Sequence, residues 1–281
     1  MKQLFLLFSI TLVFYDPAKA QLDSLSRDTL IDYELQLSGL GYEILNGADD
    51  QTKATSTRQF IRTLVRALKV KGSFAYPFDS LKTVSIIKPK DNSFRIFNWN
   101  LPTSMGKYMY FGAIQMNSRD LKLFPLLDSS DKIQHITDTI TDNNFWYGAH
   151  YYKLIENKYK KKNYYTLLGW DGNDPGSNKR VIEILTFEEG KPIFGAPIIK
   201  PGNELVQTRM LFEHSEQANM VLRYHDKRKV LFYENLIPAK SSGTGIYSTY
   251  LPDGTFDYLE FKKGFWIKGA KPFESLKLEA E

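Results

Sequence analysis

One polar stretch combines the residue types of a cation site. LLGWDGNDPGSNKRVIEI places Asp171, Asn173 and Asp174 close together between two β-rich segments. A helix–loop–helix calcium loop also needs oxygen ligands at positions 5 and 12. Counted from Asp171, these positions hold Pro175 and Ile182, and the flanks have strand composition. We therefore expect DGNDPGSNK to be a hairpin turn made of residues that tolerate turn conformations, without a high-affinity metal site.

Other side chains capable of catalysis are scattered along the chain. The histidines, which form no HxH or HxxxH pattern, are His135, His150, His214 and His225. The chain has no Cys, no GxSxG nucleophile motif and no glycine-rich phosphate or dinucleotide loop. The sequence thus predicts no catalytic residue and no cofactor. A glycosidase needs two carboxylates facing each other across a cleft, so a hydrolase assembled from distant residues remains the alternative.

Aromatic residues make up 14% of the chain and concentrate in strand-like segments. Exposed rings on a β-domain bind glycans or peptides by stacking, whereas buried rings fill the core. The candidate ligand contacts are Trp99, Trp146, Trp170 and Asp171. Alternation along the strand places Trp170 on the face of Leu168, which favours the core for both, and Gly169 leaves room for a large ring on the opposite face.

The first residues, MKQLFLLFSITLVFYDPAKAQ, resemble an export signal. Lys2 precedes an apolar run, Leu4–Tyr15, of signal-peptide length, and Ala18-Lys19-Ala20 is a small-x-small cleavage site. We expect residues 1–20 to be removed, leaving Gln21 first in a periplasmic or secreted protein. No later run has the roughly 18 apolar residues of a transmembrane helix. The net charge of +5 is mild for this length and does not favour nucleic acid as a partner.

The elements that position these side chains fall into two regions. Residues 21–72 show helical spacing of apolar residues, with one helix ending near Gly47 and a second covering about Thr52–Val70. Residues 73–281 form short strand-like segments joined by turns, among them Pro252-Asp253-Gly254. Short connections favour antiparallel neighbours. The predicted fold class is therefore α+β, mainly β: two N-terminal helices followed by an antiparallel β-meander, either propeller-like or sandwich-like.

Two stretches, FRIFNWN (94–100) and YYTLLGWDGND (164–174), resemble uncharacterised exported bacterial proteins. That resemblance implies a signal peptide, a short helical region and a β-rich domain, and it implies no activity or catalytic residue. Together with the signal and the aromatic strands, it favours a non-enzymatic exported protein of the cell envelope. Such a protein would be a binding or assembly module for an envelope protein or glycan. The alternative is a hydrolase acting on an envelope glycan or peptide polymer.

Overall fold

A computed structural model of the chain describes residues 22–202 and 205–276, so the predicted signal at residues 1–20 lies outside the described residues. Helices α1 (Ser24–Asn46) and α2 (Asp50–Lys69) come first and are followed by the strands of three sheets. The predicted fold class of two helices and then antiparallel β-structure is confirmed. Within the described ranges the sheets are open and stacked, and they form no propeller or closed barrel.

The sheets are named here by their position. The helix-side sheet contains β1 (Ser85–Ile87), β2 (Phe94–Pro102), β3 (Tyr108–Met116) and β4 (Leu123–Leu127) in sequence order. The central sheet has the order β5 (Thr141–Asp142), β9 (Lys191–Phe194), β8 (Ser177–Glu188), β7 (Lys162–Asp174) and β6 (His150–Tyr159), with β11 (Arg209–Ser215) also paired to β8. The outer sheet has the order β10 (Ile199–Lys200), β15 (Phe265–Lys268), β14 (Tyr250–Lys262), β13 (Val230–Pro238) and β12 (Leu222–His225).

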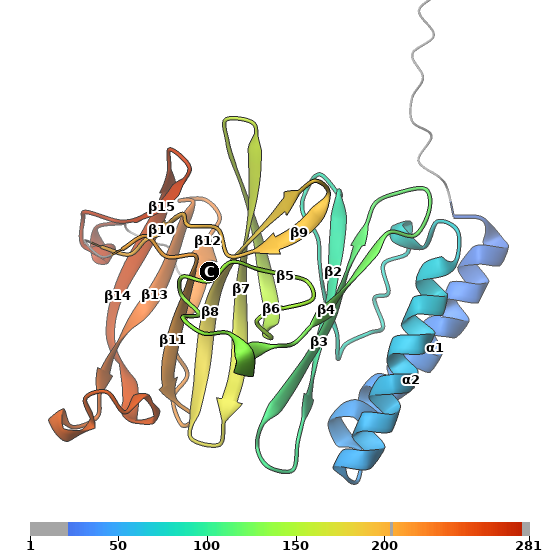
Figure 1. Ribbon diagram of the computed structural model, residues 1–281, viewed down its shortest axis with the longest axis horizontal. Helices are drawn as coiled ribbons and strands as arrows, with labels where there is room; N and C mark the ends of the chain where they lie inside the picture. Colours follow the sequence, from blue (N-terminus) through green and yellow to red (C-terminus); the bar gives the residue numbers. More distant parts are fainter. Residues whose placement is uncertain (1–21, 203–204, 277–281) are drawn as a thin grey trace, which may run out of the picture.

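The elements stack in four layers, from the helices through the helix-side and central sheets to the outer sheet (Figure 1). Strand alternation explains the stacking because successive side chains point to opposite faces. On β2, Phe97 packs toward the helices, whereas Phe94 packs toward the central sheet. On β7, Leu167 packs toward the helix-side sheet, and Leu168 packs toward the outer sheet. The central sheet is thus covered on both faces, as the sequence of β7 predicts.

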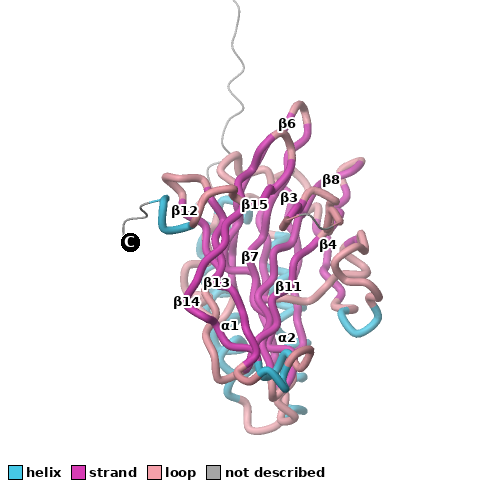
Figure 2. The backbone as a smooth tube through the Cα atoms, turned by 90° about the vertical axis from the view of Figure 1, so that its left-hand side faces the viewer, coloured by secondary structure: helices cyan, strands magenta, loops and turns pink. Residues whose placement is uncertain are grey.

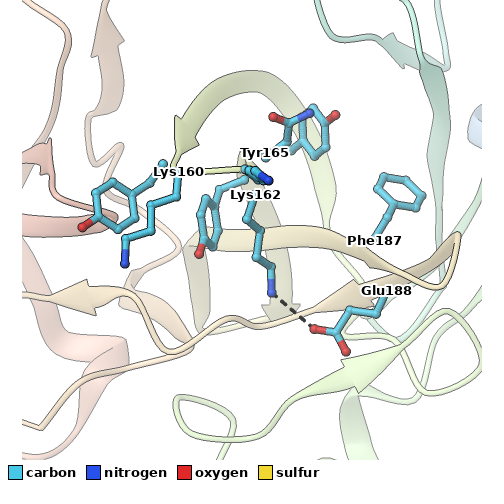
Figure 3. A pocket seen from close by; sticks show the side chains of 9 residues that line it. Lys160, Lys162, Tyr165, Phe187 and Glu188 are labelled. Carbon is cyan, nitrogen blue, oxygen red and sulfur yellow. Dashed lines mark hydrogen bonds and ion pairs between the residues drawn. The ribbon is translucent and has the colours of Figure 1, made fainter.

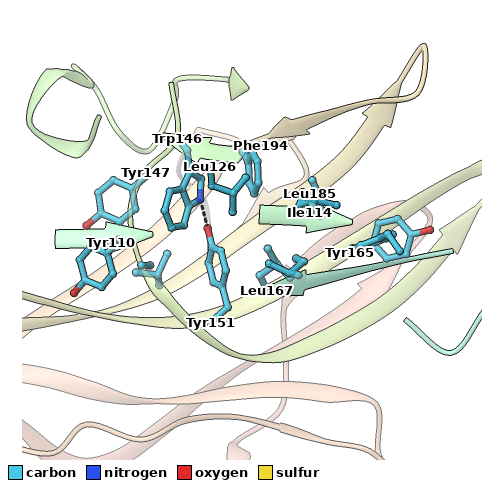
Figure 4. Packing of buried hydrophobic residues seen from close by; sticks show 14 of the residues in the cluster. Tyr110, Ile114, Leu126, Trp146, Tyr147, Tyr151, Tyr165, Leu167, Leu185 and Phe194 are labelled. Atoms are coloured by element: carbon cyan, nitrogen blue, oxygen red, sulfur yellow. Dashed lines mark hydrogen bonds between the residues drawn. The ribbon is translucent and has the colours of Figure 1, made fainter. Parts of the chain in front are cut away.

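The core between the helix-side and central sheets is rich in large rings (Figure 4). Trp146 is fully buried there, and its Nε1 donates a hydrogen bond to the Tyr151 hydroxyl at 2.9 Å. The Tyr151 ring fills the space that Gly169 leaves open, since a Cβ at Gly169 would lie 2.9 Å from that ring. The predicted role of Gly169 is confirmed.

The helices begin with capping carboxylates and bury one face each. The Asp23 carboxylate accepts a hydrogen bond from Ser26 N at 2.8 Å and so caps the start of α1. On α2, Phe60 and Leu64 are buried against the helix-side sheet. Within the described part of the chain, neither helix is long and apolar enough to cross a membrane.

One local prediction is wrong. Pro252-Asp253-Gly254 is not a hairpin turn. Pro252 pairs with Leu236, and Asp253, Gly254 and Thr255 form a bulge inside β14 opposite Asn235. Gly254 allows this because its φ of +80° lies in the left-handed region. β10 pairs with β15 in parallel. These two strands are far apart in the chain, so this pairing does not contradict the antiparallel arrangement expected across short connections.

Candidate functional site

The predicted aromatic contacts lie mainly inside the protein. Trp99 is 3% exposed and packs between Phe60 and Phe111, with ring centroids 4.8 and 5.9 Å away. Trp146 is fully buried in the core described above. Trp170 is half-buried, and its ring meets Tyr108 edge-on at 4.9 Å. The structure therefore does not bring the three tryptophans together on one surface.

Asp171 is the centre of a buried hydrogen-bond cluster. Its carboxylate accepts hydrogen bonds from the Tyr147 hydroxyl at 2.6 Å, the Tyr110 hydroxyl at 3.1 Å and Asn173 N at 2.9 Å. Burial, followed by the negative charge of Asp171, raises the pKa of both tyrosines. These contacts occupy both carboxylate oxygens, and they connect β7 to β3 and to the segment before β6. The Asp171 carboxylate thus joins the helix-side and central sheets.

The chain after Asp171 forms the expected hairpin turn. The Asp174 carboxylate accepts hydrogen bonds from Gly176 N at 2.8 Å and Ser177 N at 3.0 Å, which closes the turn between β7 and β8. Among the described residues, no group of three or more His, Asp or Glu side chains is arranged to hold a metal ion.

A buried ion pair lies in the same core. Arg209 on β11 forms an ion pair with Glu183 on β8, and both side chains are fully buried. Complete burial raises the pKa of Glu183, and the positive charge of Arg209 opposes that effect. Arg209 also donates to the Ile136 carbonyl at 2.6 Å. The pair therefore connects two strands to the loop before β5.

Two of the four histidines, His214 and His225, are buried, whereas His150 is half-buried and His135 is exposed. His214 is 1% exposed, and its Nδ1 lies 2.9 Å from the Ser215 carbonyl. Burial lowers the pKa of both His214 and His150. Like Glu183, His214 lies within the packed layers, where a polymer substrate has no access, whereas His150 is half-buried.

An open cleft lies where the outer sheet ends on the surface of the central sheet. It has a volume of about 350 Å³. β12, the four-residue edge strand of the outer sheet, forms one wall, and β6, β7 and β8 form the other. The Tyr152 hydroxyl donates to the Leu222 carbonyl at 3.0 Å, and Arg180 Nε donates to the Met220 carbonyl at 3.1 Å. These two hydrogen bonds fix the walls relative to each other. We call this hollow the β6–β12 cleft.

The β6–β12 cleft combines aromatic rings with cations. Tyr152 and Tyr224 contribute rings, and Tyr152 is 39% exposed. Burial of its hydroxyl raises the pKa of Tyr152 to about 12, although Arg180 and Arg223 act in the opposite direction. Arg180 and Arg223 line the cleft together with Lys153, whose Nζ lies 2.9 Å from the Asp226 carboxylate. Leu168, Met220 and Leu222 supply buried apolar lining.

A second hollow lies at the tip of the β6–β7 hairpin. It has a volume of about 730 Å³ and is lined by residues 159–165 with Phe187 and Glu188 (Figure 3). Lys162 Nζ lies 3.3 Å from the Glu188 carboxylate, and Lys160 Nζ lies 5.5 Å from the centroid of the Tyr159 ring. We call this the lysine hollow.

The sequence analysis did not identify the residues of the β6–β12 cleft. The available signal was the alternation in Leu222-Arg223-Tyr224, which turns Arg223 outward from an otherwise buried strand. Arg180 gave no comparable signal because its side chain reaches its hydrogen-bond partners, Asn219 and Met220, only in the folded chain. Comparisons with family models, curated proteins and solved structures found no match to this chain.

Proposed function

We propose that this chain is an exported, non-enzymatic binding module of the cell envelope, and that the β6–β12 cleft binds an acidic glycan. The observation that supports the proposal is the combination of two tyrosine rings with three cationic side chains around one open cleft. Sugar rings stack on aromatic faces, and arginine and lysine donate charge-assisted hydrogen bonds to carboxylates. The volume of about 350 Å³ is within the usual range for small-ligand sites.

The charge of the cleft favours an acidic sugar over a neutral one. Arg223 is exposed at its rim, and Arg180 is held by Asn219 Oδ1 at 2.8 Å, so its guanidinium is already oriented. Ordering a donor in advance lowers the entropic cost of binding. Export itself rests on the signal-like N-terminus and on the resemblance to exported bacterial proteins.

The hydrolase alternative has less support. It needs two ionisable groups that face each other across a cleft accessible to substrate. The buried carboxylate of Glu183 is paired with Arg209 inside the core, and Asp171 is hydrogen-bonded by two tyrosines. By contrast, the side chains around the β6–β12 cleft are aromatic, cationic, amide or apolar.

Titration calorimetry with a trigalacturonate and with its methyl ester, in which the carboxylates are neutral, tests the proposal. We expect heat of binding for the uronate and much weaker binding for the neutral sugar. Arg223→Gln should weaken uronate binding by about 10–100-fold, because a hydrogen bond to a charged group contributes roughly 1.5–3 kcal/mol. The matched control is Arg62→Gln, which removes an exposed arginine from α2 and should leave binding unchanged.

Three results would contradict the proposal. Equal affinity for both sugars would show that the cations of the cleft do not select the ligand. Shortened oligosaccharides, detected by mass spectrometry after incubation, would show that the protein is a hydrolase. If no sugar binds but an envelope protein is retained by the wild type and lost by Arg223→Gln, the cleft is an assembly site instead.

A further inference from the structure

The turns of the sheets that lie at the end of the molecule where α1 begins are rich in lysine and arginine. We call this end the basic end. Its turns are residues 88–92 (KPKDN), 117–122 (NSRDLK), 158–163 (KYKKKN), 188–191 (EEGK), 226–229 (DKRK) and 260–264 (EFKKG). In each of them except 188–191, cationic side chains outnumber carboxylates, and these cations are exposed. Lys69 and Lys71, where α2 ends, add to the same end.

Contacts between turns of different sheets place them together. On the helix-side sheet, Asn117 N donates to the Ser93 carbonyl at 2.9 Å, and Lys90 N donates to the Glu156 carboxylate of the central sheet. On the outer sheet, a Cβ at Gly264 would lie 2.6 Å from the Tyr159 ring. The basic end therefore extends over all three sheets, and the β6–β7 hairpin projects from it (Figures 1 and 2).

The opposite end has a different charge. Its turns include residues 47–50 (GADD), 103–107 (TSMGK), 174–177 (DPGS) and 215–218 (SEQA). They meet through the hydrogen bond from Ser104 N to Asp50 at 2.9 Å and the one from Glu216 N to the Gly176 carbonyl at 3.0 Å. Carboxylates outnumber the single lysine in these turns. The modest net charge of the chain thus conceals a separation of charge between two ends.

We propose that the basic end docks on an anionic lipid bilayer. The first observation is charge complementarity, because a polybasic surface is attracted to anionic headgroups and the acidic opposite end is then directed away from the membrane. The second is the pairing of cations with rings. Lys162 lies 5.7 Å from the centroid of the Tyr164 ring, and Lys122 lies 5.4 Å from that of Phe124. Aromatic and lysine side chains together are typical of a membrane–water interface.

The third observation is where the chain enters the fold. The described chain begins at Leu22, whose side chain lies next to Gly72, just after the end of α2. A Cβ at Gly72 would lie 3.0 Å from the Leu22 side chain. The apolar run Leu4–Tyr15 therefore joins the fold at the basic end. The expected export signal would thus bring this end, and not the acidic one, to the membrane before residues 1–20 are removed.

The distribution of the cations favours a surface over a polymer strand. A single-stranded polyanion follows one continuous groove. Here the cations occupy the tips of separate turns on three sheets, and the Lys162–Glu188 ion pair crosses the lysine hollow between them. A bilayer contacts all these tips at once.

Vesicle sedimentation with the exported protein tests this. Vesicles of phosphatidylcholine alone are compared with vesicles that also contain phosphatidylglycerol. The test variant is Lys161→Gln/Lys263→Asn, in which asparagine suits the positive φ of +50° at position 263. The control, Lys107→Gln/Lys240→Gln, removes two exposed lysines far from the basic end and has the same net charge. None of these residues lines the β6–β12 cleft, so the result does not depend on the proposed glycan site.

We expect binding to anionic vesicles that weakens with added salt. Each cation near the surface changes partitioning roughly fivefold, so the test variant should bind about 25-fold more weakly and the control nearly as well as wild type. Equal loss in both variants would overturn the proposal, since it would reflect total charge only. Equal binding to neutral and anionic vesicles would also overturn it. Retention by soluble heparin without vesicle binding would instead identify a polymer site.

Discussion

The buried ion pair between Glu183 and Arg209 allows a quantitative prediction. Both side chains are fully buried, and their hydrogen bonds extend to Ile184 N and to the Ile136 carbonyl. Within the described part of the chain, Arg209 Nη2 has no hydrogen-bond partner. Burying two charges is costly, and a pair with an unsatisfied donor recovers that cost incompletely. The pair should therefore contribute little net stability, although each member depends strongly on the other.

Arg209→Met should destabilise the protein by about 3–5 kcal/mol, because it leaves the Glu183 carboxylate buried without its cation. Glu183→Met should cost a similar amount for the converse reason. The double variant should cost less than either single variant, since two methionines fill the space without a buried charge. For a chain of this size each kcal/mol shifts the melting temperature by roughly 2–4 °C, so the single variants should melt about 10 °C lower.

Urea unfolding at neutral pH, followed by circular dichroism, measures the three free energies of unfolding. Lys268→Met is the matched control. The Lys268–Asp257 pair has a short distance of 2.6 Å, but its side chains are 41% and 29% exposed, and its loss should cost less than about 1 kcal/mol. If the double variant loses the sum of the two single losses, the charges are not coupled. If Arg209→Met is as stable as wild type, burial of the pair does not determine its energetics, and the reasoning fails.

Three further predictions concern the remaining polar and aromatic groups. Trp170→Ala should lower the free energy of unfolding in urea by about 2 kcal/mol. This is less than the roughly 3–5 kcal/mol expected for a fully buried ring, because Trp170 is half-buried against Tyr108. An unchanged free energy of unfolding would show that this contact contributes no stability. Millimolar calcium should leave the melting temperature unchanged, because tyrosine and backbone donors already occupy the Asp171 oxygens; a rise that Asp171→Ala abolishes would contradict this. Burial lowers the pKa of His150 and His214 below 6.5, so the unfolded chain binds more protons than the folded protein in mild acid. The free energy of unfolding should therefore decrease as the pH falls below about 6.5. Free energies of unfolding that stay constant between neutral and mildly acidic pH would contradict this prediction.

The helices and most strands could be predicted from local patterns. The apolar stripe that includes Phe60 and Leu64 specifies a helix with one buried face, and the structure has α2 over nearly the expected residues. The two covered faces of β7 follow from apolar residues at both odd and even positions, as in Leu167 and Leu168. These features depend on neighbours in the sequence, which a single sequence displays.

Features that depend on distant segments were not predictable in the same way. Alternation placed Trp170 on the face of Leu168, but Leu168 is fully buried and Trp170 is not. A strand pattern gives the expected face of a residue, whereas contacts with distant segments decide how much of the side chain is buried: Leu168 packs toward the outer sheet, but the Trp170 ring meets Tyr108 of the helix-side sheet. Similarly, Pro252-Asp253-Gly254 has turn composition, yet pairing of β14 with β13 on both sides of it keeps the strand continuous. Tertiary pairing overrides the local preference there.

The separation of charge between the two ends follows from a rule that can be applied to any antiparallel meander. Consecutive strands run in opposite directions, so consecutive turns lie at opposite ends and every second turn lies at the same end. Along β6–β9 the successive turns are KK at 160–161, PG at 175–176 and EG at 189–190, and the first and third meet through the Lys162–Glu188 pair. Summing charge over alternate turns would have revealed the basic end, whereas the net charge of the whole chain averages it with the acidic end. The same sum would not have found the β6–β12 cleft, because its cations come from strands of two different sheets, and their meeting depends on how those sheets stack.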